Sequence, residues 1–161
     1  MTTIAPLTQN NAELIANTWH YDGIYNFYDM SSDPEDYEEI LSPKLRANHY
    51  FQVVAEGQLT GFFMVEPTDQ PSIVEVGLGM KPSLTDQGKG QQFVQLILAF
   101  VNTHYHPETV IFDVAEFNIR AQTCYRNLGF MPVKRHWQAT NGGQYPFVEM
   151  QLILNTDSDH H

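Results

Sequence analysis

Hydrophobic residues recur along this chain with two spacings, one typical of helices and one typical of strands. The strand-like segments are short runs rich in β-branched and aromatic residues, bounded by glycine, proline or asparagine. The predicted helices cover 7–19, 32–41, 90–104 and a segment opening at Asn118, and the predicted strands cover 50–55, 60–65, 73–80, 109–115, 130–140 and 144–154. This order predicts an α/β protein with a mixed sheet.

Turn and capping residues mark several boundaries of these elements. Ser32 is expected to cap the second helix, with Pro34 early in the first turn and Glu35 at the third position. That helix should end near Pro43. The run Asn-Gly-Gly starting at Asn141 predicts a hairpin turn with positive φ angles.

Composition predicts one globular domain. The 161 residues are 42% hydrophobic and 17% charged, which suits a single domain over 1–155, followed by a polar tail at 156–161 that we expect to be disordered. That tail ends in His160 and His161, which are either native or the remnant of a tag. No apolar run approaches the length of a membrane span, the N-terminus lacks a signal-peptide pattern, and Cys124 is the single cysteine. These features predict a cytoplasmic protein without internal disulfides.

The net charge of −11 is unevenly distributed. Residues 1–80 carry two basic and twelve acidic side chains, net −10, whereas residues 81–161 carry six and seven, net −1. The acidic half would attract a cationic partner, or it only keeps the protein in solution; the sequence leaves both readings open. Nucleic-acid binding is not expected, because there is no basic stripe to neutralise phosphates.

The most informative stretch runs from Ile73 through Gly90. A predicted strand stops at Pro82, a polar loop covers 83–87, and Gly88 and Gly90 open a helix. Such an arrangement presents backbone N–H groups and the positive end of the helix dipole to an anion. It is not a P-loop, since Ser83 stands where that motif needs glycine, and it lacks the third glycine of a dinucleotide-binding fingerprint.

Two motifs in this chain resemble those of the GNAT acetyltransferases. Their cofactor loop, Gln/Arg-x-x-Gly-x-Gly/Ala, aligns with Thr85, Gly88 and Gly90, with threonine in place of the usual Gln or Arg. Their second signature, Asn-x-x-Ala-x-x-x-Tyr-x-x-x-Gly-Phe, is matched at every position by Asn118, Ala121, Tyr125, Gly129 and Phe130. The resemblance covers roughly residues 50 to 150.

This resemblance implies a fold and a co-substrate. The GNAT fold has a central mixed, mostly antiparallel, twisted sheet of about six or seven strands, with about four flanking helices. A V-shaped splay between its fourth and fifth strands, here those ending near Met80 and Ala115, takes the pantetheine arm of acetyl-CoA. The residues implied in cofactor binding are Leu78, Met80, Thr85, Gln87, Gly88, Lys89, Gly90, Gln91, Asn118, Ala121 and Tyr125. No metal is implied.

Acetyl transfer to an amine requires an oxyanion donor, an acid and a base. The backbone N–H of Met80 is the expected donor to the oxyanion. Tyr125 matches the general acid of the family, the alternative being a tyrosine packed in the core. Glu75 and Asp113 are the candidate bases, acting directly or through a water, with Glu75 preferred; as structural residues, Glu75 would be a buried carboxylate and Asp113 would orient a loop.

The sequence therefore predicts an N-acetyltransferase that moves an acetyl group from acetyl-CoA directly to a primary amine. The acceptor is a small cationic amine or a peptide or protein N-terminus, and the alternative function is a non-catalytic acyl-CoA-binding module. The aromatic segment 19–30 either walls the acceptor site or is a loop held by its rings against the core. The final hairpin offers an edge for a homodimer, and neither a membrane nor a nucleic-acid partner is expected.

Overall fold

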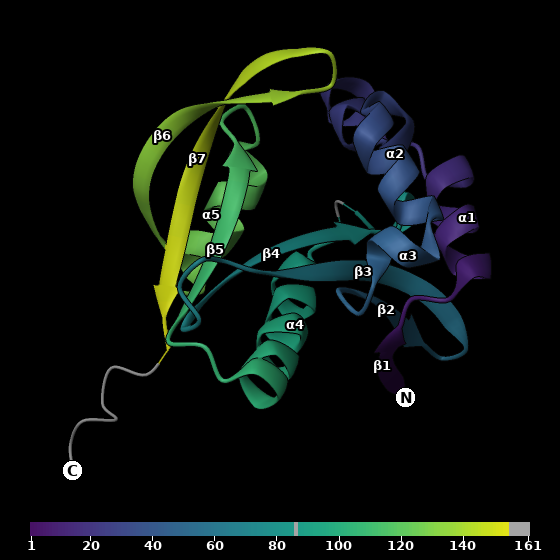
Figure 1. Ribbon diagram of the computed structural model, residues 1–161, viewed down its shortest axis with the longest axis horizontal. Coiled ribbons are helices and arrows are strands. Elements are labelled where there is room, and N and C mark those ends of the chain that lie inside the picture. The colour runs from purple at the N-terminus through teal and green to yellow at the C-terminus, as the bar shows by residue number, and fades with distance from the viewer. Residues whose placement is uncertain (86, 155–161) are drawn as a thin grey trace. The chain divides into compact units, whose positions relative to one another are not determined.

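The computed structural model describes residues 1–85 and 87–154 and contains a seven-stranded mixed sheet (Figure 1). The strand order is β1-β2-β3-β4-β5-β7-β6. The strands are β1 Thr2–Pro6, β2 Tyr50–Ala55, β3 Gln58–Pro67, β4 Ile73–Met80, β5 Thr109–Ala115, β6 Met131–Thr140 and β7 Gly143–Ile153. The predicted fold class is confirmed, and the segment expected to be a disordered tail lies outside the described residues.

Helices occupy the connections between β1 and β2, between β4 and β5, and between β5 and β6. The α-helices are α1 Gln9–Thr18, α2 Pro34–Leu41, α3 Pro43–Arg46, α4 Gly90–Tyr105 and α5 Ile119–Asn127, and the 3-10 helices are η1 Gly23–Tyr28, η2 Met30–Ser32 and η3 Pro82–Leu84. None of the helices in the described part of the chain is long and apolar enough to cross a membrane.

Contacts divide the chain into two compact units. The first comprises 1–64, 78–85 and 139–144. Its core packs α1 and α2 against residues of β2 and β3, where Ile15, Ile40 and Phe62 are buried. The turn residues Asn141 and Gly142 adopt φ angles of 51° and 76°, which confirms the hairpin turn predicted from the Asn-Gly pair.

Several elements of the N-terminal third differ from those predicted. Residues Thr2–Pro6, for which no element was predicted, form a strand paired antiparallel with β2. That helix begins at Gln9 and not at Leu7, because the Thr8 side chain caps it by accepting from the N–H of Asn11.

The second helix and the aromatic segment also differ from expectation. Asp33, not Ser32, caps α2, since its carboxylate accepts from the N–H of Glu35. Helix α2 ends at Leu41, as predicted, and Pro43 then opens the short helix α3, capped by Ser42. The aromatic segment forms the 3-10 helix η1.

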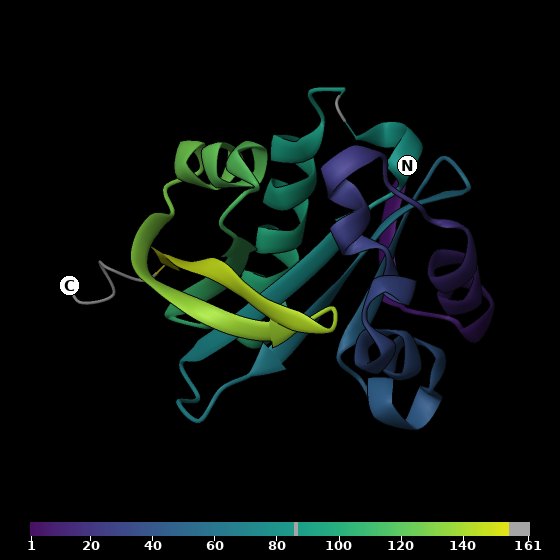
Figure 2. The same cartoon turned by 90° about the horizontal axis from the view of Figure 1, so that it is seen from above.

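The second unit comprises 65–77, 86–138 and 145–161, of which 86 and 155–161 are not described. Its core strand is β5, in which Val110, Phe112 and Val114 are buried. Helices α4 and α5 lie side by side on one face of β5 and β7 (Figure 2). The alternating residues of β5 therefore divide between a helix-covered face and an opposite face.

The parallel ladder between β4 and β5 is short. Its registered pairs run from Ile73↔Thr109 to Glu75↔Ile111. Among the described residues of the second unit, Val76 and Gly77 continue β4 without a registered partner in β5. Within the second unit, the parallel ladder therefore covers only the first three residues of β4.

Candidate active site

The loop before α4 leaves the start of that helix available to an anion. Gly88 has a φ angle of 71°, a left-handed conformation that favours glycine. Lys89 occupies the N-cap position without a side-chain cap bond, and Gln87, Gly88 and Lys89 are exposed. Gly90 and Gln91 form the first turn of the helix. The N–H groups of that turn therefore have no side-chain cap, and Lys89 adds a positive charge beside them.

Helix α5 carries the residues of the second motif. The side chain of Asn118 accepts from the N–H of Ala121 at 3.0 Å and so caps this helix. Tyr125 is buried, and its ring stacks on Phe112 with centroids 4.3 Å apart. A Cβ atom on Gly90 would lie 3.9 Å from the Sγ of Cys124, an ordinary contact that brings the start of α4 close to α5.

The end of β4 belongs to the first unit and is held by Tyr21. The Tyr21 hydroxyl donates to the carbonyl oxygen of Met80 at 2.7 Å. Burial, with a smaller contribution from Asp29, raises the pKa of Tyr21, so the hydroxyl stays a donor at neutral pH. Leu78 and Met80 are half-buried in this strand. In the same unit the Thr85 hydroxyl donates to the carbonyl of Pro82 at 2.7 Å, so this threonine closes the η3 turn.

Between Leu78 and Met80, glycine is required by packing. A Cβ atom on Gly79 would lie 2.4 Å from Cε1 of Phe62, whose ring is buried beside Trp19. The strand that carries the predicted pantetheine contacts therefore runs against an aromatic ring with no room for a side chain.

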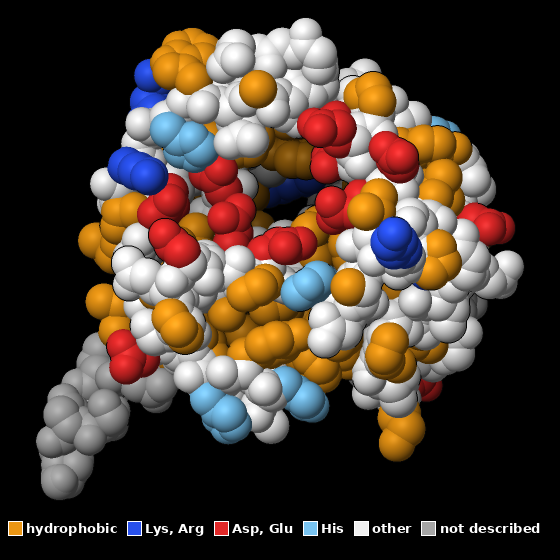
Figure 3. Space-filling model, in the orientation of Figure 1, with side chains coloured by type: hydrophobic (Ala, Val, Ile, Leu, Met, Phe, Trp, Pro, Cys, Tyr) orange, Lys and Arg blue, Asp and Glu red, His pale blue; other side chains and the backbone are white. Residues whose placement is uncertain are grey.

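A polar cluster lies on the face of β5 opposite Val110, Phe112 and Val114. Asp113 and Glu149 are directly opposite each other in the β5–β7 ladder. The Nε2 of His136 lies 2.8 Å and 3.0 Å from the two carboxylate oxygens of Asp113. Lys134 forms an ion pair with Glu149 at 3.8 Å. Figure 3 shows acidic side chains gathered over these strands, with basic and histidine side chains beside them.

Glu75 joins this cluster from β4, where it forms the last registered pair with Ile111, two residues before Asp113. Partial withdrawal from water raises the pKa of Glu75, and the nearby charges of Asp113 and Glu149 raise it further. Burial likewise raises the pKa of Asp113, while the hydrogen bond from His136 opposes that shift. Within 1–85 and 87–154, no side-chain hydrogen bond to the Glu75 carboxylate is found.

The structure thus brings the two predicted bases together but gives them different neighbours. Asp113 is bonded by His136, a residue that the sequence did not single out. Lys134 and His136 are two residues apart in β6 and therefore lie on the same face of the strand, a spacing that indicates a polar surface there. That this surface faces Asp113, 23 residues away in sequence, follows only from the strand order.

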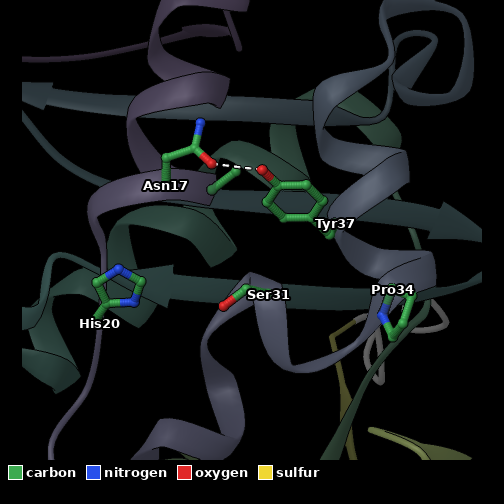
Figure 4. Close-up of a pocket in the computed structure, with 6 residues that line it drawn as sticks. Asn17, His20, Ser31, Pro34 and Tyr37 are labelled. Atoms are coloured by element: carbon green, nitrogen blue, oxygen red, sulfur yellow. Dashed lines mark hydrogen bonds between the residues drawn. The ribbon is translucent and has the colours of Figure 1, made fainter.

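A separate pocket of about 450 Å³ lies within the first unit. It is lined by Ala16, Asn17, His20, Ser31, Pro34 and Tyr37. The Tyr37 hydroxyl donates to the side-chain oxygen of Asn17 at 2.6 Å across one wall (Figure 4). None of the residues predicted for the cofactor or the chemistry lines this pocket.

A short parallel ladder, a glycine loop before a helix and a second helix that carries Tyr125 are the features that the GNAT motifs predicted. Residues 2–131 match the family described as the acetyltransferase (GNAT) domain. The chain therefore belongs to the GNAT acetyltransferase family. None of the curated proteins matches it.

Solved structures with the same fold are acetyltransferases. An aminoglycoside acetyltransferase in complex with coenzyme A is 15% identical, with a TM-score of 0.76 and 99% of each chain covered. A spermidine N-acetyltransferase chimera from Vibrio cholerae and hSSAT is 18% identical, with a TM-score of 0.76 and coverage of 94% of this chain and 95% of that one. A ribosomal-protein-S5-alanine acetyltransferase from Vibrio fischeri is 14% identical, with a TM-score of 0.71 and coverage of 96% and 94%. At these identities the likeness is one of fold.

Proposed function

We propose that this protein transfers the acetyl group of acetyl-CoA to the nitrogen of a cationic primary amine. The observation that carries the proposal is the β4–β5 ladder, which ends at Glu75↔Ile111. Beyond that point, the buried Tyr125 packs against Phe112 on one face of β5, and Asp113 lies on the other. If the thioester lies between β4 and β5 where their ladder ends, Tyr125 would be the acid on one side of it and the polar face of β5 would supply the base on the other.

Backbone groups hold the co-substrate in this proposal. The N–H groups of 87–91 bind the pyrophosphate, with Lys89 adding a charge-assisted contact. The main chain at Leu78 and Met80 binds pantetheine. Because these contacts are made by the backbone, the threonine at position 85 is compatible with binding even though its hydroxyl is bonded to Pro82.

The chemistry follows from the two faces of β5. A base on the polar face, where Glu75 and Asp113 lie, takes a proton from the ammonium group of the acceptor. The free amine attacks the thioester carbonyl, and the N–H of Met80 stabilises the resulting oxyanion. Tyr125 then donates a proton to the departing thiolate. The carboxylates of Glu75, Asp113 and Glu149 favour an acceptor that arrives with a positive charge.

The test is a CoA-release assay with acetyl-CoA and a panel of amines: spermidine, an aminoglycoside and a peptide with an N-terminal alanine. We expect release with at least one of them. We expect Tyr125→Phe to lower kcat by about 10²–10⁴-fold, the usual contribution of general acid–base catalysis, while acetyl-CoA still binds. Calorimetry with acetyl-CoA checks that binding.

A second function, a non-catalytic acyl-CoA-binding module, is favoured by one observation. Tyr125 is 8% exposed, and its ring also lies 5.8 Å from that of Phe130, as expected for a core residue. Under this alternative, acetyl-CoA binds but none of the amines releases CoA. Unchanged turnover of Tyr125→Phe would refute only the assignment of Tyr125 as the acid, and not the transferase function.

A further inference from the structure

His136 and Asp113 form a pair in which the carboxylate fixes the imidazole. Both oxygens of Asp113 lie within 3.0 Å of Nε2 of His136. A carboxylate can only accept, so Nε2 carries the hydrogen and donates it. In neutral His136 the lone pair then resides on Nδ1. Within residues 1–85 and 87–154, Nδ1 makes no hydrogen bond, so it can accept a proton.

The pair is sheltered but open to solvent. The side chains of His136 and Asp113 are 30% and 19% exposed. The ring of Phe147, on β7, lies 6.2 Å from that of His136. A base oriented by a carboxylate on one ring nitrogen, with the other nitrogen accessible, is the arrangement that activates nucleophiles in hydrolytic triads.

Charged groups face this pair from every neighbouring strand. Glu75 comes from β4, Glu149 from β7 and Lys134 from β6, and Glu66 of β3 adds a charge near Glu75. Arg135, next to His136 in sequence, is engaged by Glu116 instead. The charged groups around His136 are thus mostly carboxylates, which suit an acceptor that arrives with a positive charge.

We infer that His136 is the general base of the acetyl transfer and that Asp113 is its positioning residue, an inference that rests on the proposed function. Asp113, which the sequence offered as a base, holds and orients His136. Glu75 contributes negative charge for the ammonium group of the acceptor and for the imidazolium.

The protons balance in this scheme. His136 Nδ1 takes one proton from the ammonium group and passes it to water. The amine nitrogen then bonds to the carbonyl carbon, the carbon–sulfur bond breaks, and the thiolate takes a proton from Tyr125. The second proton that the nitrogen loses, as the amide forms, replaces the one given up by Tyr125. The overall reaction releases one proton, CoA and the N-acetylated amine.

The experiment measures kcat and KM across pH with acetyl-CoA and whichever amine of the panel releases CoA. We expect His136→Gln to lower kcat by about 10²–10⁴-fold and to flatten the dependence of kcat on pH that the wild type shows. Asp113→Asn should lower kcat by at least about tenfold, since it no longer fixes the tautomer. His104→Gln is the matched control: this histidine stacks on Phe100 at the end of α4, and its replacement should leave activity unchanged.

Two further measurements distinguish a catalytic role of His136 from a purely structural one. His136→Ala should recover activity when imidazole is added to the assay, and the affinity of both variants for acetyl-CoA should equal that of the wild type. Retained turnover in His136→Gln, with all activity lost in Glu75→Gln, overturns the inference and makes Glu75 the base. A wild type that releases CoA with none of the amines overturns the proposed function itself.

Discussion

Replacing Gly79 with alanine introduces a methyl group where the ring of Phe62 already lies. The new Cβ would be 2.4 Å from Cε1, 2.8 Å from Cζ and 3.2 Å from Cδ1 of that ring. Carbon atoms prefer separations of about 3.5–4.0 Å, so ring or strand must move by roughly 1 Å. Phe62 cannot rotate freely out of the way, because it is 4% exposed and packs beside Trp19 with centroids 6.1 Å apart.

The expected cost of Gly79→Ala is that of an overpacked core, about 1–3 kcal/mol of unfolding free energy. For a chain of this length, each kcal/mol lowers the midpoint of thermal unfolding by about 2–4 °C. We therefore expect a fall of about 2–12 °C, measured by circular dichroism. Gly90→Ala is the matched control: its Cβ would meet only Cys124 at 3.9 Å, so the midpoint should not fall.

A double-mutant cycle tests the stated cause. In a Phe62→Leu background the clash is relieved, and Gly79→Ala should cost at least about 1 kcal/mol less than it does in the wild type. Equal costs in the two backgrounds would refute the explanation, as would a Gly79→Ala variant that unfolds at the wild-type temperature.

Two further changes probe the site through stability. Asn118→Ala removes the side-chain cap of α5 and should cost about 1 kcal/mol in chemical denaturation, whereas Asn118→Asp should keep most of it; a loss shared equally by both would contradict the capping role. The pKa of Glu75 in the folded protein lies above its usual value, so the wild type loses stability as pH rises from the usual pKa through the raised one. At pH 7, Glu75→Gln should therefore have a higher free energy of unfolding than the wild type, by less than about 1 kcal/mol because the side chain is largely exposed. The difference should vanish below about pH 4, where Glu75 is protonated in both the folded and the unfolded chain. A stabilisation that persisted there would show that the charge of Glu75 is not its cause.

The central strands could be read from the sequence because local signals agree there. The segments Ile73–Met80 and Thr109–Ala115 are predicted with the bounds that the structure has. Each is a run rich in β-branched and other apolar residues next to a clear boundary, such as Pro82. The glycine loop before α4 and the helix that opens at Asn118 could likewise be predicted from the sequence, since a positive φ at Gly88 and a side-chain cap are local properties.

The features that could not be predicted from the sequence depend on pairing between distant segments. The strand Thr2–Pro6 has no strong periodicity, and it exists because β2 supplies its partners, from Thr2↔Ala55 to Pro6↔Phe51. The contact between His136 and Asp113 spans strands that are separated by β7 in the sheet. No spacing rule places a histidine and an aspartate together across an intervening strand.

The hydrogen bond from Tyr21 to Met80 has a practical consequence for studies of acidity. Since burial raises the pKa of Tyr21, its hydroxyl remains protonated throughout the range over which enzyme assays are run. The carbonyl of Met80 therefore keeps its donor whether the buffer is mildly acidic or mildly alkaline. A change of rate with pH over that range is accordingly not expected to come from ionisation of Tyr21.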